Sequence, residues 1–231
     1  LNKKVGENDI GLIVSSTGDY INLDNSIDAK INESLPVCDI TSTDNDPKVY
    51  GVISGKEDEN NERTHANGSF VTPYKKANQN EQRVFINSLG EGGIWVCNKN
   101  GNLVNGDYIS SSSVAGYGMK QTSSEGTLKN FTVAKITRDC EFGLTKVAKQ
   151  KLKTQIFDDG NTTNIDYDEN GDVQFEDDLD GDGNQQMVYP LKTRFLLPDS
   201  TQITESEYNS KSEAGDEVYV ACFVGCTYHC G

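Results

Sequence analysis

The chain has 231 residues, 34% of them hydrophobic, and a formal net charge of −15 at pH 7. A negative field of this size repels phosphate backbones and anionic headgroups, so we expect neither nucleic acid nor a membrane as a partner. The apolar content predicts a lean core, which we expect association between copies to complete.

The beginning of the chain is typical of an all-β protein. Between Ile10 and Ser54, three short runs rich in β-branched and aromatic residues are bounded by Gly, Asp, Asn or Pro. These runs predict a small β unit over residues 1–56. Residues 57–82 are polar, charged and nearly free of aliphatic side chains, and they predict a projecting loop that contains His65.

We expect residues 83–231 to form the main β domain. Residues 94–97 are β-prone and include Trp95, the only tryptophan of the chain. The pairs Asn100-Gly101 and Asn105-Gly106 follow, and both suit turns with positive φ, so we interpret residues 90–108 as a series of β-hairpins. The run from Phe131 to Ile136 has no clean polar face, which favours a central strand.

Three later segments each favour one type of secondary structure. Residues 144–157 fit either a basic helix or a long edge strand, and we favour the strand because lysines commonly protect exposed edges. Thr204 and Glu207 form a capping box and Gly215 suits a helix end, so a helix is expected between them. Residues 217–228 are the most apolar stretch, and we expect them to dock into the core or into a neighbouring subunit. The overall prediction is an all-β fold of short-stranded sandwich or barrel-like units with hairpins and one short helix near the C-terminus.

An acidic region over residues 158–184 has the spacing of a calcium loop. Oxygen ligands on alternate positions, a glycine at the sixth position and a carboxylate at the twelfth position are typical of an EF-hand loop. No helical pattern flanks it, however, and Asp, Asn and Gly are also favoured at the tips of hairpins for turn geometry alone. We favour hairpin tips and no resident cofactor, with calcium as the alternative; its predicted ligands are Asp166, Asp168, Asn170 and Asp177.

The six cysteines raise the question of disulfides or zinc. Cys38, Cys97 and Cys140 lie far apart in apolar, strand-like runs, which favours reduced and buried thiols. Near the C-terminus, Cys226, His229 and Cys230 could ligate a soft metal. Paired ligand spacing and a second ligand cluster are missing, so we favour a buried terminal strand with incidental thiols.

Signals for catalysis are weak. Ser110 to Ser113 form a serine run without the surroundings of a nucleophile elbow, and His65 and His229 are the only histidines. No glycine-rich phosphate-binding motif follows a predicted strand. We therefore expect a protein that is not an enzyme.

Four stretches carry a resemblance: GVISG, GEGGIWVCNKNGNLVNGDYISSSSVAGYGMKQ, NFTVAKITRDCEF and the terminal ACFVGCTYHCG. From about Ile10 to Gly231 the sequence resembles a C-terminal module of fibre-like or appendage-like virion proteins of large DNA viruses of algae and other protists. Over about Gly51 to Ile136 it is more distantly similar to C-terminal domains of phage tail fibres and neck appendages, including self-cleaving intramolecular chaperones.

The resemblance implies a β-rich, trimeric end-domain on the surface of a virion, made in the host cytoplasm. Capsid or other virion proteins, and a host glycan, are the partners expected beyond further copies. Trp95, Tyr108 and Tyr117 would then be packing anchors first and ligand contacts second. Two alternatives stay open: a self-cleaving chaperone domain, for which no catalytic Ser, Asp or Glu can be matched here, and a calcium-stabilised carbohydrate-binding module.

Overall fold

The structure, a computed structural model, describes residues 5–22, 34–56, 82–122, 127–156 and 163–230. It divides into two compact units: unit 1 comprises Leu1–Phe142 and Thr193–Gly231, and unit 2 comprises Gly143–Lys192. The division differs from the predicted one, because the first 56 residues join the main β domain and the acidic hairpins separate from it. His65 and nearly all of the predicted loop over 57–82 lie outside the described residues.

Unit 1 begins with a short 3-10 helix, η1 (Glu7–Asp9), and a four-stranded antiparallel sheet in the order β2-β1-β3-β4. The strands are β1 (Ile13–Asn22), β2 (Ser34–Ile40), β3 (Val49–Lys56) and β4 (Val84–Asn87). Val14 and Ile53 are fully buried in the cluster that this sheet covers. The three strands predicted for residues 10–54 are confirmed.

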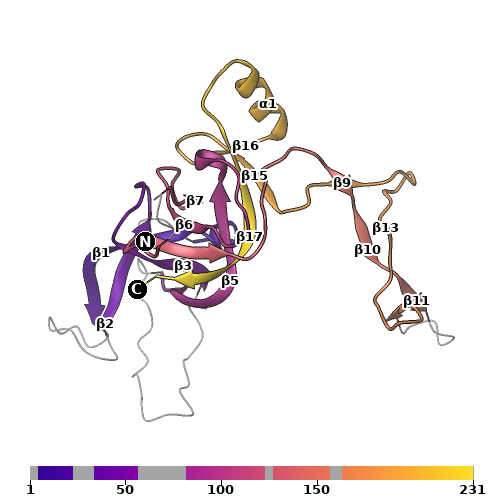
Figure 1. Cartoon of the computed structure of the whole chain (residues 1–231), viewed down its shortest axis with the longest axis horizontal. Helices are drawn as coiled ribbons and strands as arrows, with labels where there is room; N and C mark the ends of the chain where they lie inside the picture. The colour runs from indigo at the N-terminus through magenta and orange to yellow at the C-terminus, as the bar shows by residue number, and fades with distance from the viewer. Residues whose placement is uncertain (1–4, 23–33, 57–81, 123–126, 157–162, 231) are drawn as a thin grey trace, which may run out of the picture. The chain divides into compact units, whose positions relative to one another are not determined.

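The larger sheet of unit 1 closes on itself. Its order is β16-β15-β17-β5-β7-β6-β8, and an additional pairing between β17 and β8 makes β17, β5, β7, β6 and β8 a small barrel. In Figure 1, β5, β6, β7 and β17 lie close together in space, although β17 is far from the other three in the sequence. The strands are β5 (Leu89–Cys97), β6 (Tyr108–Ser111), β7 (Gly118–Lys120), β8 (Thr132–Ile136), β15 (Thr193–Leu196), β16 (Gln202–Ile203) and β17 (Tyr219–His229).

The predicted hairpin series after Trp95 is wrong in its pairing, although its turn signals are confirmed. Gly101 and Gly106 both have positive φ, at 82° and 98°. Residues Asn98–Asn100 form a 3-10 helix, η2, and β5 then pairs in parallel with β7 rather than with β6. The turns therefore lead the chain away from β5, and β7 fills the place between β5 and β6. The central position of β8 is confirmed, since it pairs with both β6 and β17.

The predicted helix is present as α1 (Glu205–Glu213). The Thr204 hydroxyl oxygen accepts from the Glu207 backbone N–H at 3.2 Å, and the Thr204 N–H donates to the Glu207 carboxylate at 2.8 Å. At the other end Gly215 has a φ of 84°, and the N–H of Asp216 donates to the Lys211 carbonyl. Both helix ends thus use the capping groups expected from the sequence. No helix in the described ranges is long and apolar enough to cross a membrane.

The apolar C-terminal segment docks into the core of its own unit. Strand β17 pairs with β5 from Ala221 to His229 and with β15 from Tyr219 to Cys222. Trp95 is 1% exposed in the resulting cluster, and the Phe223 ring packs against it with ring centroids 5.4 Å apart.

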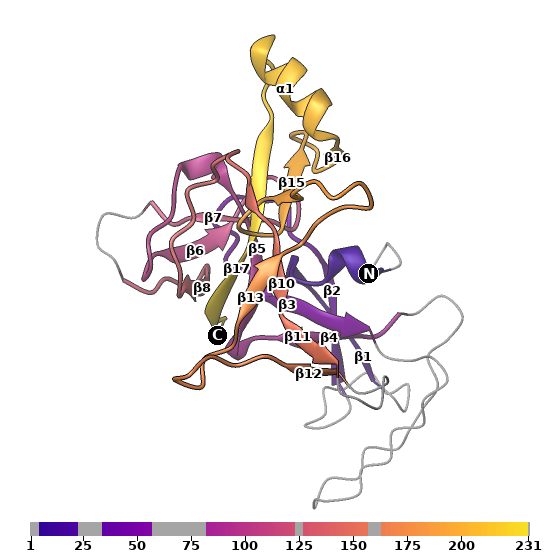
Figure 2. The same ribbon diagram turned by 90° about the vertical axis from the view of Figure 1, so that its right-hand side faces the viewer.

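Unit 2 is a narrow antiparallel ribbon. Strands β9 (Val147–Ala148), β10 (Gln150–Leu152) and β11 (Thr154–Ile156) follow one another along one side of it. They pair in turn with β14 (Met187–Val188), β13 (Phe175–Asp177) and β12 (Thr163–Ile165); Figure 2 shows β10 beside β13 and β11 beside β12. The strand interpretation of residues 144–157 is therefore confirmed over the helix. None of residues 143–154 and 164–192 is buried.

Two glycines with the same backbone angle test the packing around Trp95. Gly11 and Gly18 both have a φ of 91°, but a Cβ on Gly11 would lie 2.5 Å from Phe223 and 2.8 Å from Trp95, whereas a Cβ on Gly18 would meet nothing within 4 Å. We predict that Gly18→Ala lowers the free energy of unfolding by about 1 kcal/mol, the cost of the left-handed backbone alone. Gly11→Ala should cost about 3 kcal/mol because overpacking is added. Chemical denaturation measures both values, and equal losses would contradict the packing argument.

Candidate functional site

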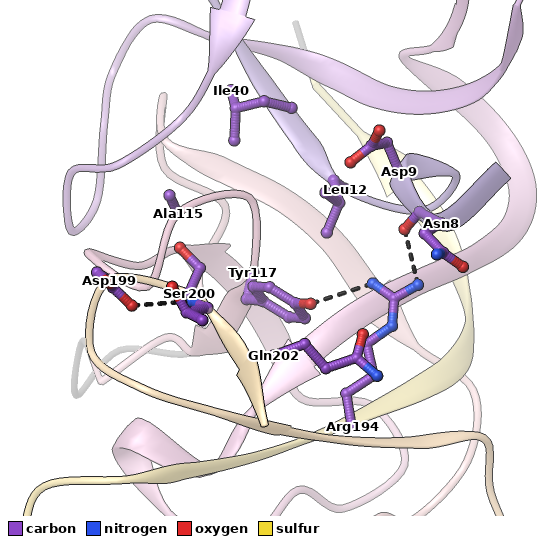
Figure 3. Close-up of a pocket in the computed structure, with 11 residues that line it drawn as sticks. Asn8, Asp9, Leu12, Ile40, Ala115, Tyr117, Arg194, Asp199, Ser200 and Gln202 are labelled. Carbon is purple, nitrogen blue, oxygen red and sulfur yellow. Dashed lines mark hydrogen bonds between the residues drawn. The ribbon is translucent and has the colours of Figure 1, made fainter. Parts of the chain in front are cut away.

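The most unusual polar side chain of unit 1 is Arg194, the second residue of β15. It is only 6% exposed, and its guanidinium carbon lies 3.8 Å from the centroid of the Trp95 ring. One terminal nitrogen donates to the Tyr117 hydroxyl at 3.1 Å, and the other donates to the Asn8 carbonyl at 2.7 Å (Figure 3). The strand pairing of β15 with β17 places Arg194 opposite Ala221, on the sheet that also carries Trp95.

A cavity of about 420 Å³ lies against this arginine. The elements around it are η1, the residue before β1, the end of β2, the turn before β7, and β15 with the hairpin that follows it. Leu12, Ile40 and Ala115 give it an apolar side, and Arg194 and Gln202 are among its polar lining residues (Figure 3). Such a mixed wall can hold a small ligand that has both apolar and hydrogen-bonding surface.

Within the described residues, no carboxylate lies at salt-bridge distance from the guanidinium of Arg194, and both of its hydrogen-bond acceptors are neutral oxygens. Two carboxylates also line the cavity, but they accept from backbone groups: Asp9 from the Gly6 N–H at 2.8 Å and Asp199 from the Thr201 N–H at 2.9 Å. A buried charge is normally paired, so this arrangement is unusual for a purely structural arginine.

The structure brings together two of the three aromatic residues singled out from the sequence. The rings of Trp95 and Tyr117 lie 6.2 Å apart at 66°, and both contact Arg194. Tyr108 lies elsewhere on β6, where the His229 ring meets it edge-on at 6.3 Å. Sequence reasoning missed Arg194. The only available signal was a lone basic residue in an apolar, strand-like run, and such a residue usually points to solvent.

The acidic ribbon of unit 2 contains two closely similar turns, twelve residues apart. In the first turn, Asp168 Oδ1 accepts the backbone N–H groups of Asn170 and Asp172. In the second turn, Asp180 Oδ1 accepts those of Asp182 and Asn184. These bonds lower the pKa of both aspartates, chiefly through Asp172 in the first turn and Asn184 in the second. The backbone hydrogen bonds by themselves account for Asp at these positions.

A lysine closes the base of each turn. Lys153 Nζ lies 3.0 Å from the Asp166 carboxylate and donates to the Gln174 side chain at 3.2 Å. Lys149 makes the matching contacts with Asp178 at 2.6 Å and Gln186 at 3.5 Å. The same set of side chains therefore ties each turn to the side of the ribbon that carries β9, β10 and β11.

The predicted calcium ligands are distributed along this ribbon. Asp166 is bound by Lys153, Asp168 holds its turn, Asn170 is at the exposed tip, and Asp177 lies in β13 opposite Gln150. Among the described residues, no three His, Cys, Asp or Glu side chains form a group suited to a metal ion. Calcium binding here stays a prediction.

The C-terminal cysteines are spread along one strand. Cys222, Cys226 and Cys230 are separated by even numbers of residues along β17 and the residue after it, so their side chains lie on the same face of the strand. All six cysteines of the protein are buried and have free thiols. His229 falls on the opposite face, where its Nε2 lies 3.0 Å from the Thr227 hydroxyl. The side chains considered as soft-metal ligands therefore do not share a face.

The serine run has a structural use in unit 1. Ser111 donates to the Thr43 carbonyl at 2.8 Å and accepts from the Asp46 N–H at 2.9 Å, while Ser112 donates to the Tyr117 carbonyl at 2.7 Å. Residues 41–46 are thereby attached to the end of β6.

No protein-family model, curated protein or solved structure matches this chain.

The paired turns of the ribbon give a direct test of the role of Asp180. We predict that Asp180→Ala speeds amide hydrogen exchange at Asp182 and Asn184, because the side-chain acceptor of both N–H groups is lost. Asp180→Asn should keep slow exchange, since its carbonyl oxygen can accept the same bonds. The untouched turn at Asp168 serves as an internal control in the same spectrum. Fast exchange in the Asn variant as well would show that the negative charge, rather than the acceptor, matters.

The buried thiols give a prediction on pH. Desolvation by burial raises the pKa of Cys38 to about 11 and those of Cys226 and Cys230 to about 12. At pH 8.5 these side chains should remain protonated and escape alkylation by iodoacetamide in the native protein, but react in denaturant. A raised pKa stabilises the fold below the unfolded value of about 8.5 and loses that contribution as the pH rises above it, so stability should fall above about pH 9. Site-resolved mass spectrometry and melting curves check both statements, and rapid native labelling would contradict them.

Proposed function

We propose that this chain is a non-enzymatic structural domain of a virion fibre, spike or minor capsid component, and that it acts by associating with further copies of itself. The observation that carries the proposal is the ribbon of unit 2, in which none of residues 143–154 and 164–192 is buried. The resemblance noted in the sequence supports the viral setting, and the all-β fold is compatible with it.

The ribbon exposes many apolar side chains for its size. Leu152 and Phe175 face each other across β10 and β13 and are 43% and 58% exposed. Isolated two-stranded ribbons are at best marginally stable in water, because they bury too little apolar surface to offset the entropy of ordering the chain. The exposed apolar residues of this unit are Leu144, Val147, Leu152, Ile165, Tyr167, Val173, Phe175, Leu179 and Met187.

Another copy of the same chain is the partner that best fits this surface. In the described part of unit 2, each strand pairs on one side only, so the ribbon offers open backbone edges along its length. A closed symmetric assembly would cover the edges and the apolar side chains of all copies by the same contacts. We propose a trimer, in keeping with the resemblance. Its setting is the particle surface, with other virion proteins as neighbours and a host glycan as the external ligand.

The oligomeric state tests this proposal. Light scattering of the purified chain should give three times the 25.3 kDa of one copy. The double variant Leu152→Ser/Phe175→Ser should shift the protein towards monomer, because it removes exposed apolar surface that the assembly would bury. It should leave the core of unit 1 folded, as followed by the fluorescence of Trp95.

Phe85→Ser is the matched control, because Phe85 is also a strand phenylalanine, 48% exposed, but lies in unit 1. It should leave the measured mass unchanged. A monomeric parent protein would overturn the proposal, and so would a trimer that the double variant leaves intact.

A further inference from the structure

We propose that the cavity beside Arg194 binds a small ligand that carries one carboxylate on a hydroxyl-bearing ring, which is the chemistry of an acidic sugar. This inference does not rest on self-association, because every residue that carries it belongs to unit 1.

The guanidinium of Arg194 has no carboxylate at salt-bridge distance among the described residues. A guanidinium has five N–H donors, and in this structure Arg194 donates once to the Tyr117 hydroxyl and once to the Asn8 carbonyl. The Trp95 ring covers it at 3.8 Å. These contacts fix the side chain in place, but all three partners are neutral. Buried charges in proteins are usually paired, so the missing group is an anion, and the cavity is the space next to the arginine that could hold one.

The charges in the cavity wall favour a carboxylate over a phosphate. Among the described residues, Arg194 is the only cationic side chain that lines the cavity, whereas Asp9 and Asp199 add two negative charges to its wall. A phosphate dianion would bring two charges to one arginine and would be repelled by both aspartates. A carboxylate brings a single charge and matches the planar fork of the guanidinium.

The remaining lining of the cavity indicates what the rest of the ligand is like. The lining of the cavity combines the apolar side chains of Leu12 and Ile40 with the polar groups of Ser200 and Gln202 (Figure 3). A sugar ring has both kinds of surface, with C–H groups on its face and hydroxyls around its edge. The volume of about 420 Å³ lies in the usual range for small-molecule sites. Ser200 is held at a φ of 66° at the tip of the β15–β16 hairpin, so its place in the wall is fixed by the turn.

The chain contains its own reporter for this site. Trp95 is the only tryptophan and lies against the arginine. We would titrate the full chain with D-glucuronate, with D-glucose as the neutral sugar, with acetate as the bare carboxylate and with inorganic phosphate. The expected result is a saturable change of Trp95 fluorescence with glucuronate at a concentration at least tenfold lower than with any of the other three. Equal responses to glucuronate and glucose, or tighter binding of phosphate, would overturn the proposal.

Variants then locate the binding. Arg194→Met keeps an unbranched apolar stem but removes the guanidinium and its charge, and it should abolish the glucuronate response in a protein that still melts cooperatively. Gln202→Ala leaves the stack of Arg194 on Trp95 in place and should weaken glucuronate binding severalfold. If Arg194→Met does not fold, the Gln202→Ala variant decides whether glucuronate binds in this cavity. Lys135→Met is the control, since Lys135 also lies over an aromatic ring, that of Tyr108, outside the cavity. Unchanged glucuronate binding in Gln202→Ala, or an equal loss in Lys135→Met, would contradict the site.

Discussion

The packing of β17 against β5 is the interaction on which the rest of unit 1 depends. Nine residues of β17 pair with β5, and the same strand also pairs with β15 and with β8. Its pairing with β5 joins residues that are more than a hundred positions apart in the sequence. The apolar side chains of β17 are covered on formation of these pairs, and this burial supplies the free energy that holds the barrel closed.

Trp95 contacts both Phe223 of β17 and Arg194, which lines the cavity. Its ring is contacted by Phe223 from β17, by the edge of Tyr117 and by the guanidinium of Arg194, and its Nε1 donates to the Ile10 carbonyl at 3.1 Å. Gly11 must be a glycine for the ring to fit. The residues that stabilise the core are thus the same ones that orient the buried arginine. A rigid support of this kind is what a binding site needs, because the arginine then loses little freedom when a ligand arrives.

The two units differ in how far they bury their apolar residues. Unit 1 buries many of its apolar residues, among them the cluster around Trp95 and the cluster around Ile53, and attaches its loops by buried polar contacts such as those of Ser111. Unit 2 has regular backbone pairing and repeated lysine contacts, but none of residues 143–154 and 164–192 is buried. Exposed ion pairs add little stability, so these lysine contacts do not replace the stabilisation that buried apolar side chains give unit 1.

The sequence by itself determined the features that depend on near neighbours. The caps of α1 at Thr204 and Gly215, the positive φ of Gly101 and Gly106, and the strand character of β8 and β17 all follow from residues within a few positions. Tertiary structure alone decided that β7 lies between β5 and β6, that the acidic ribbon forms its own unit, and that Arg194 is buried against Trp95. Strand order and burial depend on contacts between segments far apart in the chain, and alternation of residue types is the same whichever strand becomes the neighbour.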